Sequence, residues 1–109
     1  MPYIECKTNV PVKDTQKLVN ELGEAIRIIP KKSPEVTMIE VEGGRNLYYA
    51  GSAEPCAIIL TWVNNTTDMS SAQDYNAKVL EILAENLGVD KKRIYATVQK
   101  LECWYAERK

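Results

Sequence analysis

The chain has 109 residues, of which 45% are hydrophobic and 27% charged, with only five Gly and five Pro. This composition is typical of one globular domain, residues 1–109, and excludes disordered, collagen-like and disulfide-scaffold proteins. Fourteen Lys and Arg stand against fifteen Asp and Glu, so the chain lacks the basic excess of a nucleic-acid-binding protein.

The first half of the chain predicts a strand, a helix and a second strand. Residues 3–8 alternate between apolar and polar side chains, which indicates a half-buried strand. A helix follows from about Asp14, a typical N-cap residue, and ends at Pro30. Its apolar stripe consists of Leu18, Leu22, Ile26 and Ile29. The second strand covers residues 36–42, and residues 47–50 are a candidate for a further short strand.

The second half predicts the same order of elements. Residues 56–63 are a continuous apolar run, as expected for a strand that is covered on both faces or central in a sheet. Ser70 and Gln73 form a capping box that opens a helix, and Gly88 ends it. Residues 93–101 alternate again and predict a closing strand. The inward side chains of this second helix are predicted to be Val79, Leu80, Leu83 and Leu87.

The two halves therefore form a duplicated β-α-β arrangement. Asp14 and Ser70 are 56 positions apart, as are Val36 and Lys92. Each right-handed crossover makes its two strands parallel. We expect an α/β (α+β) fold in which a four-stranded mixed sheet carries both helices on one face. Apolar residues such as Trp62 fall on the other face as well, which predicts that a further subunit covers it.

The residue types restrict the chemistry that the chain can perform. It contains no His, which excludes Ser-His-Asp and Cys-His triads and His-based metal sites. The three cysteines are Cys6, Cys56 and Cys103; they are dispersed, form no CxxC motif and cannot build a four-thiolate zinc site. We expect no metal and no organic cofactor. Any proton transfer must then use a carboxylate, Lys, Tyr, Cys or a chain terminus.

The surroundings of the protein follow from similar features. No apolar run reaches the roughly 18 residues of a membrane-spanning helix, and residues 1–7 lack the apolar core of a secretory signal. An odd number of dispersed cysteines indicates reduced thiols. We expect a cytoplasmic protein without membrane or nucleic-acid partners, and secretion by a route without a signal peptide stays open.

Several short motifs lie along the chain in an order that is typical of one protein family. Pro2 follows Met1, residues 8–11 (TNVP) end the first strand, and residues 51–57 (GSAEPCA) open the third. Together with Lys32, Ala84-Glu85 and Arg93-Ile94-Tyr95, these motifs resemble the macrophage migration inhibitory factor and D-dopachrome tautomerase family over residues 2–104. The resemblance implies a homotrimer whose sheets surround a channel, with active sites at the subunit interfaces. It also implies keto–enol tautomerisation of small α-keto acids such as phenylpyruvate.

Pro2 is the base that the resemblance implies. The small residue after Met1 permits removal of Met1, which leaves Pro2 as a free secondary amine. An ordinary α-amino group has a pKa of about 7.7–8.0, and burial or nearby cations lower it toward neutrality, where a general base works best. The alternative is that Pro2 marks N-terminal processing only. A Pro2 nitrogen acylated by Met1 has no basic lone pair.

The resemblance also implies four substrate-binding residues. Lys32, or in its place Lys31, binds the substrate carboxylate, and the backbone N–H of Asn64 contacts the same group. Tyr95 lines the pocket of a neighbouring subunit. The alternative is that Tyr95 is only a half-buried aromatic residue of the last strand. Thr97 stands where macrophage migration inhibitory factor has an Asn that binds the substrate, and the Thr side chain is shorter than that of Asn.

The sequence also allows functions other than a tautomerase. The residues at Asn64 and Thr97 differ from the family pattern and the tail is short, which favours a cytokine-like or receptor-binding protein with a vestigial pocket. Hydration or dehalogenation of an unsaturated acid ranks last, because the four arginines form no cluster. Cys56 lacks a second thiol at Ile59, which excludes a disulfide oxidoreductase. Trp104 is assigned either to the pocket rim or to packing on the adjacent subunit.

Overall fold

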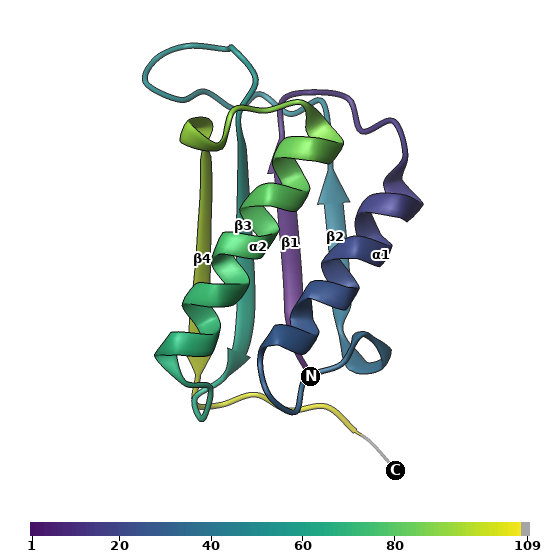
Figure 1. Ribbon diagram of the computed structural model, residues 1–109, viewed down its shortest axis with the longest axis vertical. Coiled ribbons are helices and arrows are strands. Elements are labelled where there is room, and N and C mark those ends of the chain that lie inside the picture. Colours follow the sequence, from purple (N-terminus) through teal and green to yellow (C-terminus); the bar gives the residue numbers. More distant parts are fainter. Residues whose placement is uncertain (108–109) are drawn as a thin grey trace.

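Four β-strands form one sheet in the computed structural model, which describes residues 1–107 (Figure 1). The strands are β1 (Tyr3–Thr8), β2 (Met38–Glu42), β3 (Ala57–Asn64) and β4 (Ile94–Leu101). Their order across the sheet is β2-β1-β3-β4. The pairs β1–β2 and β3–β4 are parallel, and the central pair β1–β3 is antiparallel. The predicted four-stranded mixed sheet is confirmed.

Both long helices lie on one face of this sheet, as predicted (Figure 1). Helix α1 (Thr15–Ala25) begins after Asp14, whose carboxylate accepts a hydrogen bond from the Lys17 amide at 3.1 Å. A 3₁₀ turn (Ile26–Ile28) extends it toward Pro30. Helix α2 (Met69–Leu87) ends at Gly88, which adopts the left-handed conformation with φ 68°.

The predicted start of α2 is wrong by two residues. Asp68 is the N-cap, because its carboxylate accepts hydrogen bonds from the Ser71 amide at 2.8 Å and the Ser71 hydroxyl at 2.9 Å. These bonds lower the pKa of Asp68 below its ordinary value. Ser70 therefore lies inside the first helical turn and does not cap it.

Two strand boundaries also differ from the sequence-based expectation. Residues 34–36 form a 3₁₀ turn, so β2 begins only at Met38. Residues 47–50 form no strand: Tyr49 and Ser52 pair across a tight turn in which Ala50 and Gly51 both have positive φ. The turn uses the backbone groups that a longer strand would need.

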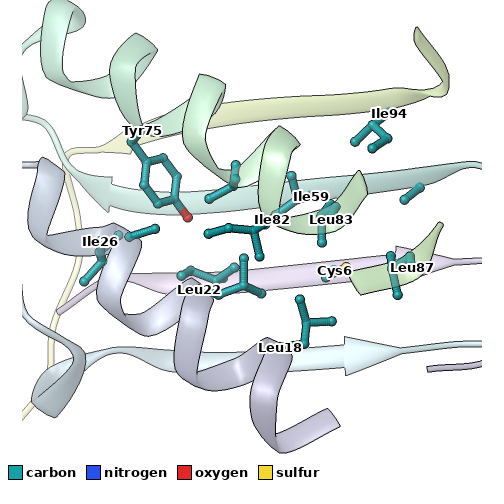
Figure 2. Packing of buried hydrophobic residues seen from close by; sticks show 14 of the residues in the cluster. Cys6, Leu18, Leu22, Ile26, Ile59, Tyr75, Ile82, Leu83, Leu87 and Ile94 are labelled. Atoms are coloured by element: carbon teal, nitrogen blue, oxygen red, sulfur yellow. The ribbon is translucent and has the colours of Figure 1, made fainter. Parts of the chain in front are cut away.

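The hydrophobic core fills the space between the helices and the sheet (Figure 2). Leu18 and Leu22 of α1 and Val79 and Leu83 of α2 are fully buried there, as predicted, whereas Leu80 is only partly buried. The core contains a polar pair, because the hydroxyls of Thr61 and Tyr75 lie 2.7 Å apart and both residues are fully buried. Each hydroxyl satisfies the other.

Cys6 is fully buried in this core, and burial raises the pKa of its thiol to about 12, above its ordinary 9.0. The native chain therefore holds this proton more tightly than the unfolded chain. The free energy of unfolding is unaffected by Cys6 below about pH 9 and falls between pH 9 and pH 12. Relative to Cys6→Ala, the wild-type protein should lose about 1–2 kcal/mol between pH 8 and pH 10.5 in urea titrations. Parallel pH profiles for the two proteins would contradict the burial of this thiol.

The face of the sheet away from the helices is only partly covered. Side chains of β3 alternate between buried and half-buried, so this strand is central in the sheet but not covered on both faces within one subunit. Strand register places Met38, Tyr3 and Trp62 in one row on the open face. Met38 is 70% exposed there. Within residues 1–107, no helix combines the length and apolar character needed to cross a membrane.

Candidate active site at the N-terminus

Pro2 lies where β1 begins, and it is buried. Its carbonyl oxygen accepts a hydrogen bond from the Met38 amide at 3.0 Å, which continues the pairing of β1 with β2. The first residue of β1 is thus fixed by the sheet, and Pro2 is fixed with it. Met1 precedes Pro2 at the end of the sheet where β3 and β4 finish (Figure 1).

An aromatic cavity of about 470 Å³ lies on one side of Pro2. The ring of Trp62 contacts Tyr3 with centroids 5.3 Å apart and Trp104 with centroids 5.8 Å apart. The contacts are tilted and edge-on, and this aromatic lining suits a flat apolar ligand. The lining residues are Met1, Pro2, Tyr3, Glu5, Val36, Met38, Trp62, Trp104, Tyr105 and Ala106.

A polar cavity of about 640 Å³ shares Met1 and Ala106 with the aromatic cavity. Lys32 lines it and donates a hydrogen bond to the Asn64 side-chain oxygen at 3.5 Å. Partial burial, together with the ammonium of Lys31, lowers the pKa of Lys32 below its ordinary value. The Thr67 hydroxyl on the same cavity is buried and has no hydrogen-bond partner among residues 1–107. These groups offer donors to an anion.

The structure therefore brings three of the five predicted site residues to the same end of the sheet. Pro2 lines the aromatic cavity, and Lys32 and Asn64 line the polar cavity next to Met1. Asn64 contributes its side chain to this cavity through the contact with Lys32. Its backbone N–H was the predicted donor.

Tyr95 and Thr97 lie elsewhere in the subunit. They belong to β4, where they pair in register with Ile58 and Leu60, away from the Trp62 end of β3. Tyr95 is 61% exposed and packs edge-on against Tyr49, with ring centroids 5.7 Å apart. One subunit does not bring these two side chains to its own Pro2. Their role in the site of a neighbouring subunit stays a prediction.

The sequence-based prediction missed the polar wall of the aromatic cavity. The Tyr3 hydroxyl lies 2.7 Å from a carboxylate oxygen of Glu40 and 2.9 Å from one of Glu5, and its single proton is shared between these two acceptors. The hydrogen bond to Glu40, burial and the hydrogen bond to Glu5 raise the pKa of Tyr3 above its ordinary value. The alternation of residues 3–8 already places Tyr3 and Glu5 on one face, and this signal could have identified them.

The segment after β4 crosses beside the N-terminus (Figure 1). Within it, the indole Nε1–H of Trp104 donates a hydrogen bond to the Met1 carbonyl oxygen. Trp104 also lines the aromatic cavity of its own subunit, and its packing on an adjacent subunit stays a prediction. In residues 1–107, no group of three or more His, Cys, Asp or Glu side chains is arranged to hold a metal ion.

Comparison with known proteins supplies the family. The sequence model described as "Macrophage migration inhibitory factor (MIF)" matches residues 1–108. "D-dopachrome decarboxylase" of Gallus gallus is 34% identical, over 95% of this chain and 90% of that protein. The Xenopus tropicalis protein of the same name is 28% identical, over 100% and 94%.

The fold has close counterparts among solved structures. The crystal structure of Leishmania major MIF2 superposes with a TM-score of 0.85 at 18% identity, over 96% of this chain and 93% of that one. The structure of the factor from Trichinella spiralis gives a TM-score of 0.75 at 20% identity, over 92% and 89%. Because the family model spans almost the whole chain, the protein belongs to the macrophage migration inhibitory factor family.

Proposed function

We propose that, once Met1 has been removed, the protein is a cofactor-independent keto–enol tautomerase of small α-keto acids, with Pro2 as general acid and base. The position of Pro2 carries this proposal: it is buried and lines an aromatic cavity, and Met1 links that cavity to one containing Lys32. The relatives named D-dopachrome decarboxylase support an enzymatic function.

The proposed reaction needs one base and no co-reactant. The uncharged amine of Pro2 takes a proton from the carbon next to the keto group. The C–H electron pair forms the new C=C bond, and the carbonyl π pair moves to oxygen. Protonated Pro2 then returns the proton to that oxygen, which yields the enol; ketonisation is the reverse. Burial of Pro2 favours the uncharged amine that this sequence requires.

A phenylpyruvate-like substrate matches the two cavities in chemistry. Its ring fits the cavity formed by Tyr3, Trp62 and Trp104, where stacking contributes beyond simple burial. Its carboxylate fits the polar cavity, where Lys32 supplies positive charge and Asn64 and Thr67 supply polar groups. Partial burial strengthens the attraction between an ammonium and a carboxylate.

The proposed active enzyme is a homotrimer. The open face of the sheet exposes Met38 and Tyr95, which a second subunit would cover. In that assembly Tyr95 and Thr97 of one chain complete the site of another. A C₃ arrangement is heterologous and closes on itself, so each subunit both gives and receives these residues.

The test compares processed and blocked N-termini. Intact-mass measurement identifies protein without Met1, and ultraviolet absorbance then follows phenylpyruvate enolisation, with D-dopachrome as a second substrate. Light scattering should give three chain masses. A variant with Ala inserted between Met1 and Pro2 keeps the Pro2 nitrogen in a peptide bond and should be inactive. A processed trimer that turns over neither substrate would overturn the proposal and favour a cytokine-like binding protein.

A further inference from the structure

The hydrogen bond between Trp104 and Met1 fixes a donor beside the Pro2 nitrogen. The indole Nε1–H of Trp104 donates to the Met1 carbonyl oxygen. That oxygen is bonded to the carbon that acylates the Pro2 nitrogen, so only one atom separates the acceptor from this nitrogen. The donor is therefore directed at the space immediately next to the proposed base.

The Trp104 ring is held by residues other than Met1. Its edge-on contact with Trp62 has centroids 5.8 Å apart and an interplanar angle of 79°. Trp62 contacts Tyr3 in turn, and both residues belong to paired strands of the sheet. The Tyr3 hydroxyl is anchored through its bonds to Glu5 and Glu40. The supports of the indole therefore remain when Met1 is absent.

Removal of Met1 takes away the acceptor but leaves the donor. Trp104 is half-buried, and a partly buried N–H that loses its partner is costly unless another acceptor replaces it. The space that the Met1 carbonyl vacates adjoins both cavities, because Met1 lines each of them. An oxygen of a bound ligand is the natural replacement at this point.

We propose, on the basis of the proposed function, that Trp104 is a further catalytic residue that donates a hydrogen bond to the substrate's keto oxygen. As Pro2 removes the carbon-bound proton, negative charge develops on this oxygen, and the fixed indole N–H stabilises it. Lys32 stays with the carboxylate in the polar cavity. In the aromatic cavity Glu5 is the one charged side chain among the described lining residues, so a neutral donor carries the task.

The experiment removes the N–H and keeps the shape of the ring. Trp104 is replaced by β-(3-benzothienyl)alanine, in which sulfur takes the place of the indole N–H, and separately by Phe (Trp104→Phe). With phenylpyruvate and protein lacking Met1, we expect kcat to fall roughly 100-fold for both, with KM much less affected, as for a lost preorganised donor. The control is Tyr48→Phe, an exposed ring outside both cavities, which should keep wild-type kinetics.

Nuclear magnetic resonance provides a readout that packing alone would not change. The indole ¹H–¹⁵N resonance of Trp104 should shift when Met1 is removed and shift again when phenylpyruvate is added. If the wild-type protein turns over phenylpyruvate and the benzothienyl protein has the same kcat, the proposed role of Trp104 is wrong. The proposed function would not be affected by that result. Absence of turnover in processed wild-type protein would overturn the proposed function, and this inference with it.

Discussion

Replacement of Pro2 by Gly should lower kcat/KM for phenylpyruvate enolisation by about 10²- to 10⁴-fold, the usual contribution of a positioned general base. Met1 is also removed before Gly, so Pro2→Gly retains a free amine. That amine is no longer part of a pyrrolidine ring, so its lone pair is no longer held in one direction next to the start of β1. The expected loss is therefore one of position, which a 1 Å displacement is sufficient to cause.

The matched control is Pro11→Gly, the same chemical change at an exposed position. It should have wild-type turnover. Intact mass must show both variants without Met1, and light scattering must show both with the wild-type subunit number. Turnover by Pro2→Gly at the wild-type rate would contradict a requirement for the proline ring at the terminal amine.

Truncation of Tyr75 should have the largest effect on stability. Tyr75→Ala deletes a fully buried ring and should cost about 3–5 kcal/mol, a large share of the 5–15 kcal/mol that typical domains possess. Tyr75→Phe keeps the ring but leaves the buried Thr61 hydroxyl without its partner, at a cost of about 1–3 kcal/mol. The double variant Tyr75→Phe with Thr61→Val removes both polar groups and should recover most of that loss.

Urea unfolding at one fixed protein concentration measures these differences, because the midpoint of the proposed trimer would depend on concentration. Tyr48→Phe makes the same chemical change at an exposed ring and should stay within about 0.5 kcal/mol of wild type. If the double variant proved less stable than Tyr75→Phe, the two hydroxyls would not form an isolated pair in the native core.

Much of the fold follows from local patterns. The alternation in residues 3–8 buries its apolar side chains only as a strand, and the apolar stripe of α1 is buried only as a helix. Patterns of this kind made the four strands and two helices predictable. The start of α2 was not, because Asp68 and Ser70 are both good caps and only the geometry of the preceding loop selects Asp68. The turn at Ala50 likewise depends on positive φ in a non-glycine residue, which no local pattern indicates.

The site was predictable only where the chain pattern fixes its neighbours. Pro2 at the start of β1 and Asn64 at the end of β3 lie at the same end of the sheet because these central strands are antiparallel. The contact between Trp104 and Met1 joins residues 103 positions apart through a segment without regular structure, so no periodicity foretells it. The proposed role of Tyr95 lies in the site of a neighbouring subunit, and the fold of one chain does not test it.

The antiparallel centre of the sheet gives the molecule an internal two-fold pseudo-symmetry, which relates the start of β1 to the start of β3 at the opposite end. The two corners are nevertheless not equivalent. At the start of β3 the chain is continuous with the residues that precede the strand. There the Arg93 guanidinium donates hydrogen bonds to the carbonyl oxygens of Pro55 at 2.9 Å and Glu54 at 3.0 Å. A duplicated scaffold thus offers two matching corners, and under the proposed function only the corner that holds Pro2 presents a backbone amine.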